Sequence, residues 1–206
     1  MTEEARVRRM AQEIVAREGG YVDDPDDPGG ATNHGVTLGT LQRVGSDLDG
    51  DGDVDRADLS RLTESDAAAI FLRDYFHAPR IGALPEVLQP SVFDMYVNAG
   101  AGAVRLLQRL LCDMGEAVAV DGVIGPQTLA AARRAADAAP DHIADAYGIA
   151  RRNYYFALAD RRPASRKFAR SRAGGKGGWI RRAESFVSPR FHLTEAQFRA
   201  RVAAWG

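Results

Sequence analysis

The segment from Glu18 to Thr32 combines side chains that are suited to general acid–base chemistry. Glu18 is the last residue of a predicted amphipathic helix whose apolar stripe contains Val7, Ala11 and Ile14. A carboxyl group that continues this stripe, at the negative end of a helix dipole, is expected to have a raised pKa. An acid of this kind can protonate the leaving oxygen of a glycosidic bond.

The residues after Glu18 could complete such a site. Gly19 and Gly20 end the helix and would allow a sugar to approach the backbone. Tyr21 offers an aromatic wall, Asp27 a second carboxylate, and Thr32 a hydroxyl that could hold a water. Taken singly, the Asp-Pro and Gly-Gly pairs of this segment are ordinary turn formers, and a glutamate at a helix end can be purely structural.

A second pattern, in residues 47–58, is typical of cation binding. Oxygen-bearing side chains occupy positions 1, 3, 5, 9 and 12 of an EF-hand loop, with Gly52 at position 6 and Val54 at position 8. Position 7, Asp53, would contribute its backbone carbonyl. So many close carboxylates repel one another unless a cation lies among them. The alternative is a solvated acidic loop. We predict a structural Ca²⁺ site with these ligands: Asp47, Asp49, Asp51, Asp53, Asp55 and Asp58.

Three short strings within residues 18–37 together resemble glycoside hydrolase family 108. They are Glu-Gly-Gly-Tyr from Glu18, Asp-Pro-Gly-Gly-x-Thr from Asp27, and Gly-Val-Thr ending at Thr37. The resemblance implies a lysozyme-like fold and N-acetylmuramidase activity, with hydrolysis of the β-1,4 bond between N-acetylmuramic acid and N-acetylglucosamine. It also implies that Glu18 is the catalytic acid and that catalysis needs no cofactor.

The second catalytic group stays open at this point. Asp27 and Thr32 are the candidates, and Thr37 is a further threonine that could contact the substrate. If either candidate holds a water, the reaction inverts the anomeric centre and the carboxyls lie roughly 6.5–9.5 Å apart. A covalent route would instead need a carboxylate about 5 Å from the acid.

The resemblance continues downstream. Residues 93–100 resemble the family's helix that faces the cleft, where Asn98 would bind an N-acetyl group or would simply cap the helix before a glycine. Gln108 is expected to reach the same cleft. Residues 121–128 resemble the family's predicted peptidoglycan-binding segment, and residues 170–177 depart from the family as an insertion. This basic insertion would attract stem-peptide carboxylates or would form a solvated surface.

Hydrophobic periodicity predicts a mainly α, lysozyme-like α+β fold: a two-lobed helical domain with a small hairpin and an EF-hand-like calcium loop. Residues 21–62 are predicted to be loops, with a hairpin near 34–40, and residues 161–178 are predicted to be loop. Predicted helices start near Thr63, Pro90, Ala103, Pro126, Pro140, Trp179 and Thr194. We divide the chain into a catalytic part (5–92, with the calcium loop at 47–58), a helical lobe (93–187) and a C-terminal helical tail (188–206).

Composition limits the partners. The chain has 206 residues and a net charge of -1, which favours no nucleic acid. It has no apolar run for stable membrane insertion and no signal peptide, so we expect synthesis in the cytoplasm. The protein would then act on peptidoglycan in the periplasm or cell wall. We also expect a monomer. Export would then require a holin or a secretion system. The single cysteine, Cys112, is predicted to be buried.

Two other functions fit parts of this sequence. Residues 121–128 alone would suit a non-catalytic peptidoglycan-binding module, but this leaves the acid at the end of an apolar helix face unexplained. The acidic loop would suit a calcium-dependent secretion accessory protein. A dockerin, however, needs two such loops in a row, and residues 47–58 are a single loop. Muramidase activity explains more of the residue patterns described above than either alternative does.

Overall fold

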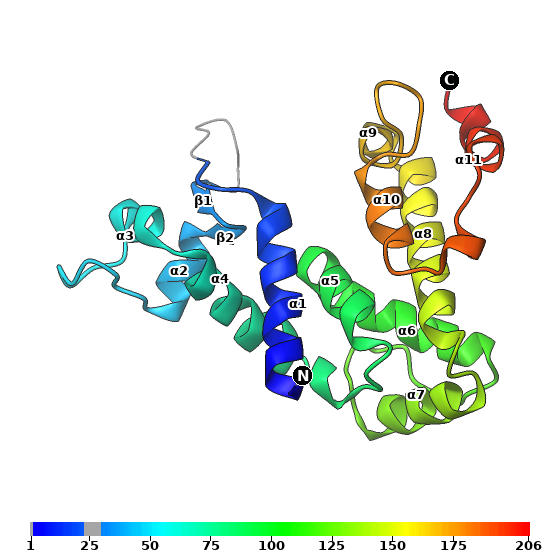
Figure 1. Ribbon diagram of the computed structural model, residues 1–206, viewed down its shortest axis with the longest axis horizontal. Coiled ribbons are helices and arrows are strands. Elements are labelled where there is room, and N and C mark those ends of the chain that lie inside the picture. Colours follow the sequence, from blue (N-terminus) through cyan, green and yellow to red (C-terminus); the bar gives the residue numbers. More distant parts are fainter. Residues whose placement is uncertain (1, 23–29) are drawn as a thin grey trace. The chain divides into compact units, whose positions relative to one another are not determined.

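The computed structural model describes residues 2–22 and 30–206, and for Glu18 it describes the backbone. The chain divides into two units, residues 1–78 and 79–206. Helices dominate both of them, and a two-stranded sheet lies in the first (Figure 1). The predicted mainly helical fold with a small hairpin is confirmed.

The first unit is built around two helices that pack along each other, α1 and α4 (Figure 1). A π-helical turn over Leu72–His77 continues the second of them. The elements of this unit are α1 (Glu3–Glu18), β1 (Thr32–Asn33), β2 (Val36–Thr37), α2 (Leu38–Val44), α3 (Arg56–Arg61) and α4 (Glu64–Phe71).

Residues next to each end of α1 determine where the helix begins and ends. The Thr2 hydroxyl caps the first turn by accepting a hydrogen bond from the Ala5 amide at 3.3 Å. At the other end, Gly19 has a φ of 84°, which a residue with a side chain rarely adopts. The glycine pair therefore ends the helix directly after Glu18, as predicted.

The prediction that residues 21–62 are loops is wrong for two short helices, α2 and α3. Thr37 caps α2 by accepting a hydrogen bond from the Thr40 amide, and Asp55 forms a capping box with Asp58 at the start of α3. The predicted hairpin is present, but it covers residues 32–37 instead of 34–40. Polar caps thus stabilise helices that are too short to show a clear hydrophobic period.

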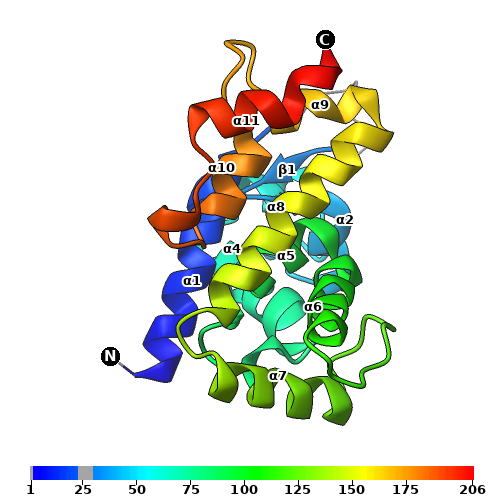
Figure 2. The same cartoon turned by 90° about the vertical axis from the view of Figure 1, so that its right-hand side faces the viewer.

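The regular elements that the structure describes in the second unit are all helices or helical turns. The long helix α8 runs beside α10 (Figure 2). The helices of this unit are α5 (Gln89–Ala99), α6 (Ala101–Asp113), α7 (Pro126–Ala138), α8 (Ile143–Arg161), α9 (Arg166–Ala169), α10 (Gly178–Glu184) and α11 (Glu195–Val202). Short 3-10 turns cover Ile81–Ala83, Pro163–Ser165, Pro189–Phe191 and Ala203–Trp205. The expected loop at 161–178 is therefore partly helical.

A buried ionic network ties three helices of the second unit together. Asp94 of α5 is 1% exposed and accepts hydrogen bonds from the guanidinium groups of Arg151, on α8, and Arg182, on α10. The Arg151 side chain is completely buried, and Arg182 Nε lies 2.9 Å from Asp94 Oδ1. Asp94 and Arg151 thus pair where water is excluded, while the Arg182 side chain is 21% exposed.

The last residues of the chain belong to the core of the second unit. Phe198, Val202 and Trp205 are buried against Phe156 and its neighbours on α8. Cys112, by contrast, is exposed, so the prediction that it is buried is wrong. Among the residues that the structure describes, no helix has the length and hydropathy to cross a membrane.

Candidate active site

Glu18 occupies the last position of α1, where the sequence places it. The three apolar members of its stripe, Val7, Ala11 and Ile14, are 7%, 0% and 3% exposed. The helix therefore buries the predicted face. The orientation of the Glu18 carboxyl group and its raised pKa stay predictions.

A β-hairpin follows this helix and fixes the candidate threonines. The turn residues His34 and Gly35 have φ values of 50° and 76°. Two positive φ values in a row are typical of a type I′ turn, and glycine adopts one of them without strain. Asn33 pairs with Val36, and Thr32 lies directly opposite Thr37. Both threonines therefore point to the same face of the hairpin.

The two threonines differ in the use of their hydroxyl groups. The Thr37 hydroxyl accepts a hydrogen bond from the Thr40 amide at 3.1 Å and donates one to the Thr40 hydroxyl at 3.0 Å. Thr37 thus serves as a helix cap. The half-buried Thr32 side chain makes no hydrogen bond to another residue of the described ranges 2–22 and 30–206.

The segment after Glu18 returns to this hairpin. Val22 and Thr32 exchange two backbone hydrogen bonds of 2.8 Å and so form an antiparallel bridge. Tyr21 and Val22 are 45% and 53% exposed. Two large apolar side chains in water beside a polar strand suit a surface that contacts a ligand. Asp27 lies outside the described residues.

Asn33 is a positioning residue that the sequence does not reveal. It is 4% exposed, and its amide group donates to the carbonyl oxygens of Leu59 at 2.8 Å and Leu62 at 3.3 Å. The hairpin is thereby attached to the end of α3, the helix that follows the acidic loop. A local signal was present only in the Asn-His-Gly turn sequence, which does not indicate the distant carbonyl partners.

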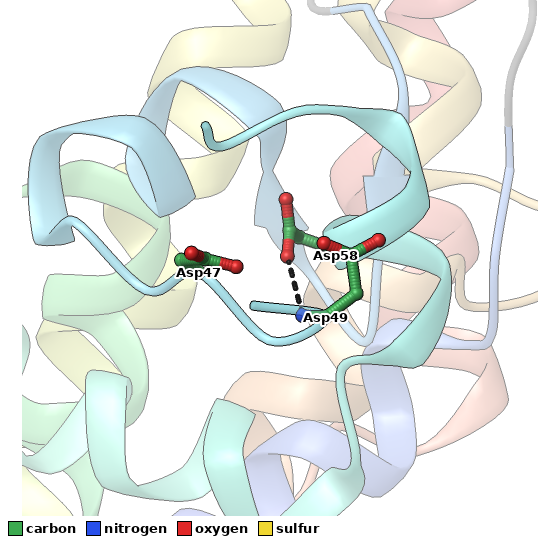
Figure 3. Close-up of side chains that lie close together, drawn as sticks. All are labelled: Asp47, Asp49 and Asp58. Atoms are coloured by element: carbon green, nitrogen blue, oxygen red, sulfur yellow. Dashed lines mark hydrogen bonds between the residues drawn. The ribbon is translucent and has the colours of Figure 1, made fainter. Parts of the chain in front are cut away.

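The acidic loop at residues 47–58 joins α2 to α3 and places several carboxylates close together. Ligand atoms of Asp47, Asp49 and Asp58 lie within 4.8 Å of one another, and so do those of Asp53, Asp55 and Asp58. Figure 3 shows the first of these groups around the Asp58 carboxylate. Each group could hold a metal ion.

Backbone hydrogen bonds shape this loop. The buried Asp58 carboxylate accepts from the amides of Leu48 at 2.5 Å, Asp49 at 3.1 Å and Asp55 at 2.9 Å. Gly52 has a φ of 99°, which explains the glycine at position 6 of the loop. Asp51 belongs to neither metal-binding group, and its carboxylate accepts a hydrogen bond from the Asp53 amide.

The pKa of Asp58 is shifted in the opposite direction from the pKa values of Asp49 and Asp53. The backbone amide groups, that of Asp55 foremost, lower the pKa of Asp58. Desolvation raises the pKa of Asp49, and repulsion from Asp51 raises the pKa of Asp53. A cation bound between these carboxylates would oppose both increases.

The two predicted substrate-binding residues of the second unit differ in availability. Asn98 is exposed near the end of α5, and its amide group donates to the Asp94 carbonyl oxygen at 2.9 Å. Gln108 is fully buried on α6 and holds the turn at residues 121–128. Its amide donates to Asp121, Val123 and Thr128, and its oxygen accepts from the Gly122 amide at 2.8 Å. This burial favours a structural role for Gln108 and leaves no free carboxamide group for a sugar.

Comparisons with known proteins agree with this architecture. Residues 11–100 match the family model described as "Glycosyl hydrolase 108", and residues 102–184 match the model described as "Predicted Peptidoglycan domain". The solved structure titled "Structure of Brucella abortus SagA" has 28% sequence identity and a TM-score of 0.60, over 94% of this chain and 99% of that chain. A search of curated proteins found no match. Residues 11–100 therefore match the glycosyl hydrolase 108 family, and a predicted peptidoglycan domain follows them at 102–184, as the sequence resemblance implies.

Proposed function

We propose that the protein is an N-acetylmuramidase that hydrolyses the β-1,4 bond between N-acetylmuramic acid and N-acetylglucosamine in peptidoglycan. The observation that carries this proposal is the match of residues 11–100 to a glycoside hydrolase family, followed directly by a predicted peptidoglycan domain at 102–184. A catalytic part and a wall-binding part in one chain suit a polymer that is insoluble and must be held during cleavage.

Glu18 is the proposed general acid. It ends a helix whose buried stripe leads up to it, beside a segment that pairs with Thr32. There the carboxylic acid would protonate the glycosidic oxygen as the bond to the leaving sugar breaks. Tyr21, which is 45% exposed, would stack on a sugar ring.

The second catalytic group is proposed to position a water on the opposite face of the sugar. The Thr32 hydroxyl suits this role better than that of Thr37, because the Thr37 hydroxyl is used as a helix cap. Asp27 would accept a proton from the same water. With this arrangement the reaction inverts the anomeric centre.

The digestion products test the proposed bond specificity. Purified peptidoglycan is incubated with the protein, reduced with borohydride and examined by mass spectrometry. We expect new fragments that end in reduced muramic acid, and NMR during the digest should show the α anomer of the first product. Fragments that end in reduced glucosamine would contradict the muramidase proposal. Binding to the wall without any new reducing end would identify a non-catalytic peptidoglycan-binding module.

We also propose that the acidic loop binds Ca²⁺ as a structural ion. Flexible carboxylates of this number suit Ca²⁺, with six to eight oxygen ligands, better than Mg²⁺, which requires a near-ideal octahedron. Asp58 would act from the buried side, and the carboxylates of residues 47–55 would close around the ion. The ion would stiffen the loop to which Asn33 attaches the hairpin, without entering the reaction.

Calcium should stabilise the protein measurably. An ion at 100 times its Kd adds about 2.7 kcal/mol to the free energy of unfolding if only the folded state binds it. We expect EGTA to lower the melting temperature of the wild type, excess Ca²⁺ to restore it, and Mg²⁺ to restore it less. A double variant, Asp47→Asn with Asp49→Asn, should lose the response. An identical melting curve with EGTA and Ca²⁺, without heat of Ca²⁺ binding in calorimetry, would show that the loop is merely acidic.

A further inference from the structure

The positive charge of the chain is concentrated in its second unit. Residues 79–206 contain 19 Lys and Arg against 11 Asp and Glu, a net charge of +8, whereas residues 1–78 have 8 against 17, a net charge of -9. The bias is strongest in residues 161–183, which contain nine Lys and Arg but neither Asp nor Glu. A stretch of this kind attracts anions beyond what the overall charge of -1 suggests.

Hydrogen bonds give this basic stretch a defined shape. After α9 the chain makes a tight turn in which Arg170 pairs with Lys176 as an antiparallel bridge. The Ser171 amide donates to the Gly175 carbonyl oxygen at 2.8 Å. Gly177 lies so close to the preceding helix that a Cβ there would come within 2.4 Å of the Phe168 carbonyl oxygen. The insertion is thus a turn whose backbone has a defined shape.

A pocket of about 560 Å³ opens between α9 and this turn. It is lined by Lys167, Phe168, Arg170, Ser171, Arg172 and Gly174. Among the described residues, neither Lys167 nor Arg172 forms an ion pair, and both are exposed. Arg170 donates to the Gly206 carbonyl oxygen at 2.7 Å and is thereby fixed at the edge of the pocket. Two cations are therefore available to an incoming anion.

Aromatic rings form one wall beside these cations. Phe168 stacks on Trp179 with 5.0 Å between the ring centroids, and Trp179 stacks on Tyr155 at the same distance. Phe168 is nevertheless 45% exposed, and Lys167 Nζ lies 5.1 Å from its ring centroid. A ring that stacks on Trp179 and is still 45% exposed gives a sugar or peptide an apolar contact surface beside the Lys167 ammonium group. A free inorganic anion has no apolar surface that could pack against such a ring, so the ring favours an organic ligand.

We propose that this pocket binds the carboxylates of peptidoglycan stem peptides, with Lys167 and Arg172 as the charged contacts and Phe168 against the adjoining glycopeptide. The guanidinium of Arg172 can donate two parallel hydrogen bonds to one carboxylate. The pocket lies inside residues 102–184, the predicted peptidoglycan domain. The identity of the polymer rests on the proposed function, whereas the binding step requires no catalysis by Glu18.

Binding of the full chain to insoluble peptidoglycan tests this proposal. The measurement uses the Glu18→Gln protein at low temperature, so that hydrolysis does not compete with sedimentation of the complex. We expect Lys167→Gln with Arg172→Gln to raise the Kd roughly tenfold, since two charge-assisted contacts are lost. The matched control, Arg109→Gln with Arg133→Gln, removes the same charge from exposed positions of α6 and α7 and should leave the Kd unchanged.

Chemical modification of the wall identifies the group that is bound. Peptidoglycan whose carboxyls have been converted to amides should bind the Glu18→Gln protein about as weakly as native peptidoglycan binds the pocket variant. Equal Kd values for the pocket variant and the control, or undiminished binding to the amidated wall, would overturn the proposal. So would equally tight binding to vesicles of anionic phospholipid, because this would show a general anion surface. A protein that binds as proposed but never cleaves the wall would contradict the muramidase activity alone.

Discussion

Replacing Glu18 by glutamine should lower the initial rate of peptidoglycan hydrolysis by about 10²–10⁴-fold, the range that a positioned general acid contributes. Glutamine keeps the size of the side chain but has no proton of comparable acidity to give to the glycosidic oxygen. The loss should appear in kcat, since the substitution leaves the proposed wall-binding pocket of the second unit unchanged. The decrease in turbidity of a cell-wall suspension measures the rate.

The same helix offers a matched control for this substitution. Glu13 of α1 is an exposed glutamate that pairs with Arg9 at 3.1 Å, and a surface pair of this kind contributes little stability. Glu13→Gln should keep the activity of the wild type. Equal activity of the Glu18→Gln and Glu13→Gln proteins, with unchanged melting temperatures, would remove Glu18 from the mechanism.

Asparagine in place of Asp94 should cost about 3–5 kcal/mol of the free energy of unfolding, because it leaves buried guanidinium charge without a counter-charge. The Arg151 side chain is completely buried, so water cannot replace the lost carboxylate. Both tryptophans, Trp179 and Trp205, lie in the same unit as Asp94. Denaturant unfolding followed by tryptophan fluorescence therefore reports on the correct part of the chain.

An exposed aspartate of the second unit controls for the chemical change. Asp137→Asn, on α7, should shift the unfolding midpoint only slightly, as most surface substitutions do. A loss below about 1 kcal/mol for Asp94→Asn would mean that the network relaxes or admits water and does not hold α5, α8 and α10 together.

Local signals explain which elements could be predicted. The double glycine after Glu18, the capping box from Thr63 to Asp66 and the prolines Pro90 and Pro126 mark helix ends whose positions the structure confirms. Each signal acts within one turn of the chain, so a single sequence is enough to reveal it.

The acidic loop shows how one pattern can hide another. The loop spacing predicts that Asp55 and Asp58 bind a metal, and the same two residues form the capping box that starts α3. The sequence therefore does not reveal the helix, because the spacing of these carboxylates also fits an EF-hand loop. Position 12 of an EF-hand loop lies within the helix that follows, so both roles are compatible for Asp58.

Contacts between distant residues could not be derived from the sequence. Asp94 meets Arg151 and Arg182 across 57 and 88 residues, and no periodicity links them. The sequence predicts that Gln108 faces the substrate, but the side chain is buried on α6 and supports the turn at 121–128. A polar residue in an apolar helix can serve a ligand or a neighbouring loop, and only the tertiary structure distinguishes the two.

The most direct test of the central claim is a digest of purified peptidoglycan by the wild type, Glu13→Gln and Glu18→Gln, with the products reduced by borohydride and analysed by mass spectrometry. We predict fragments that end in reduced muramic acid from the first two proteins and none above background from the third. New muramic acid ends from Glu18→Gln at the wild-type rate would contradict the assignment of the acid. A wild type that sediments with the wall but releases no such ends would contradict the enzyme itself.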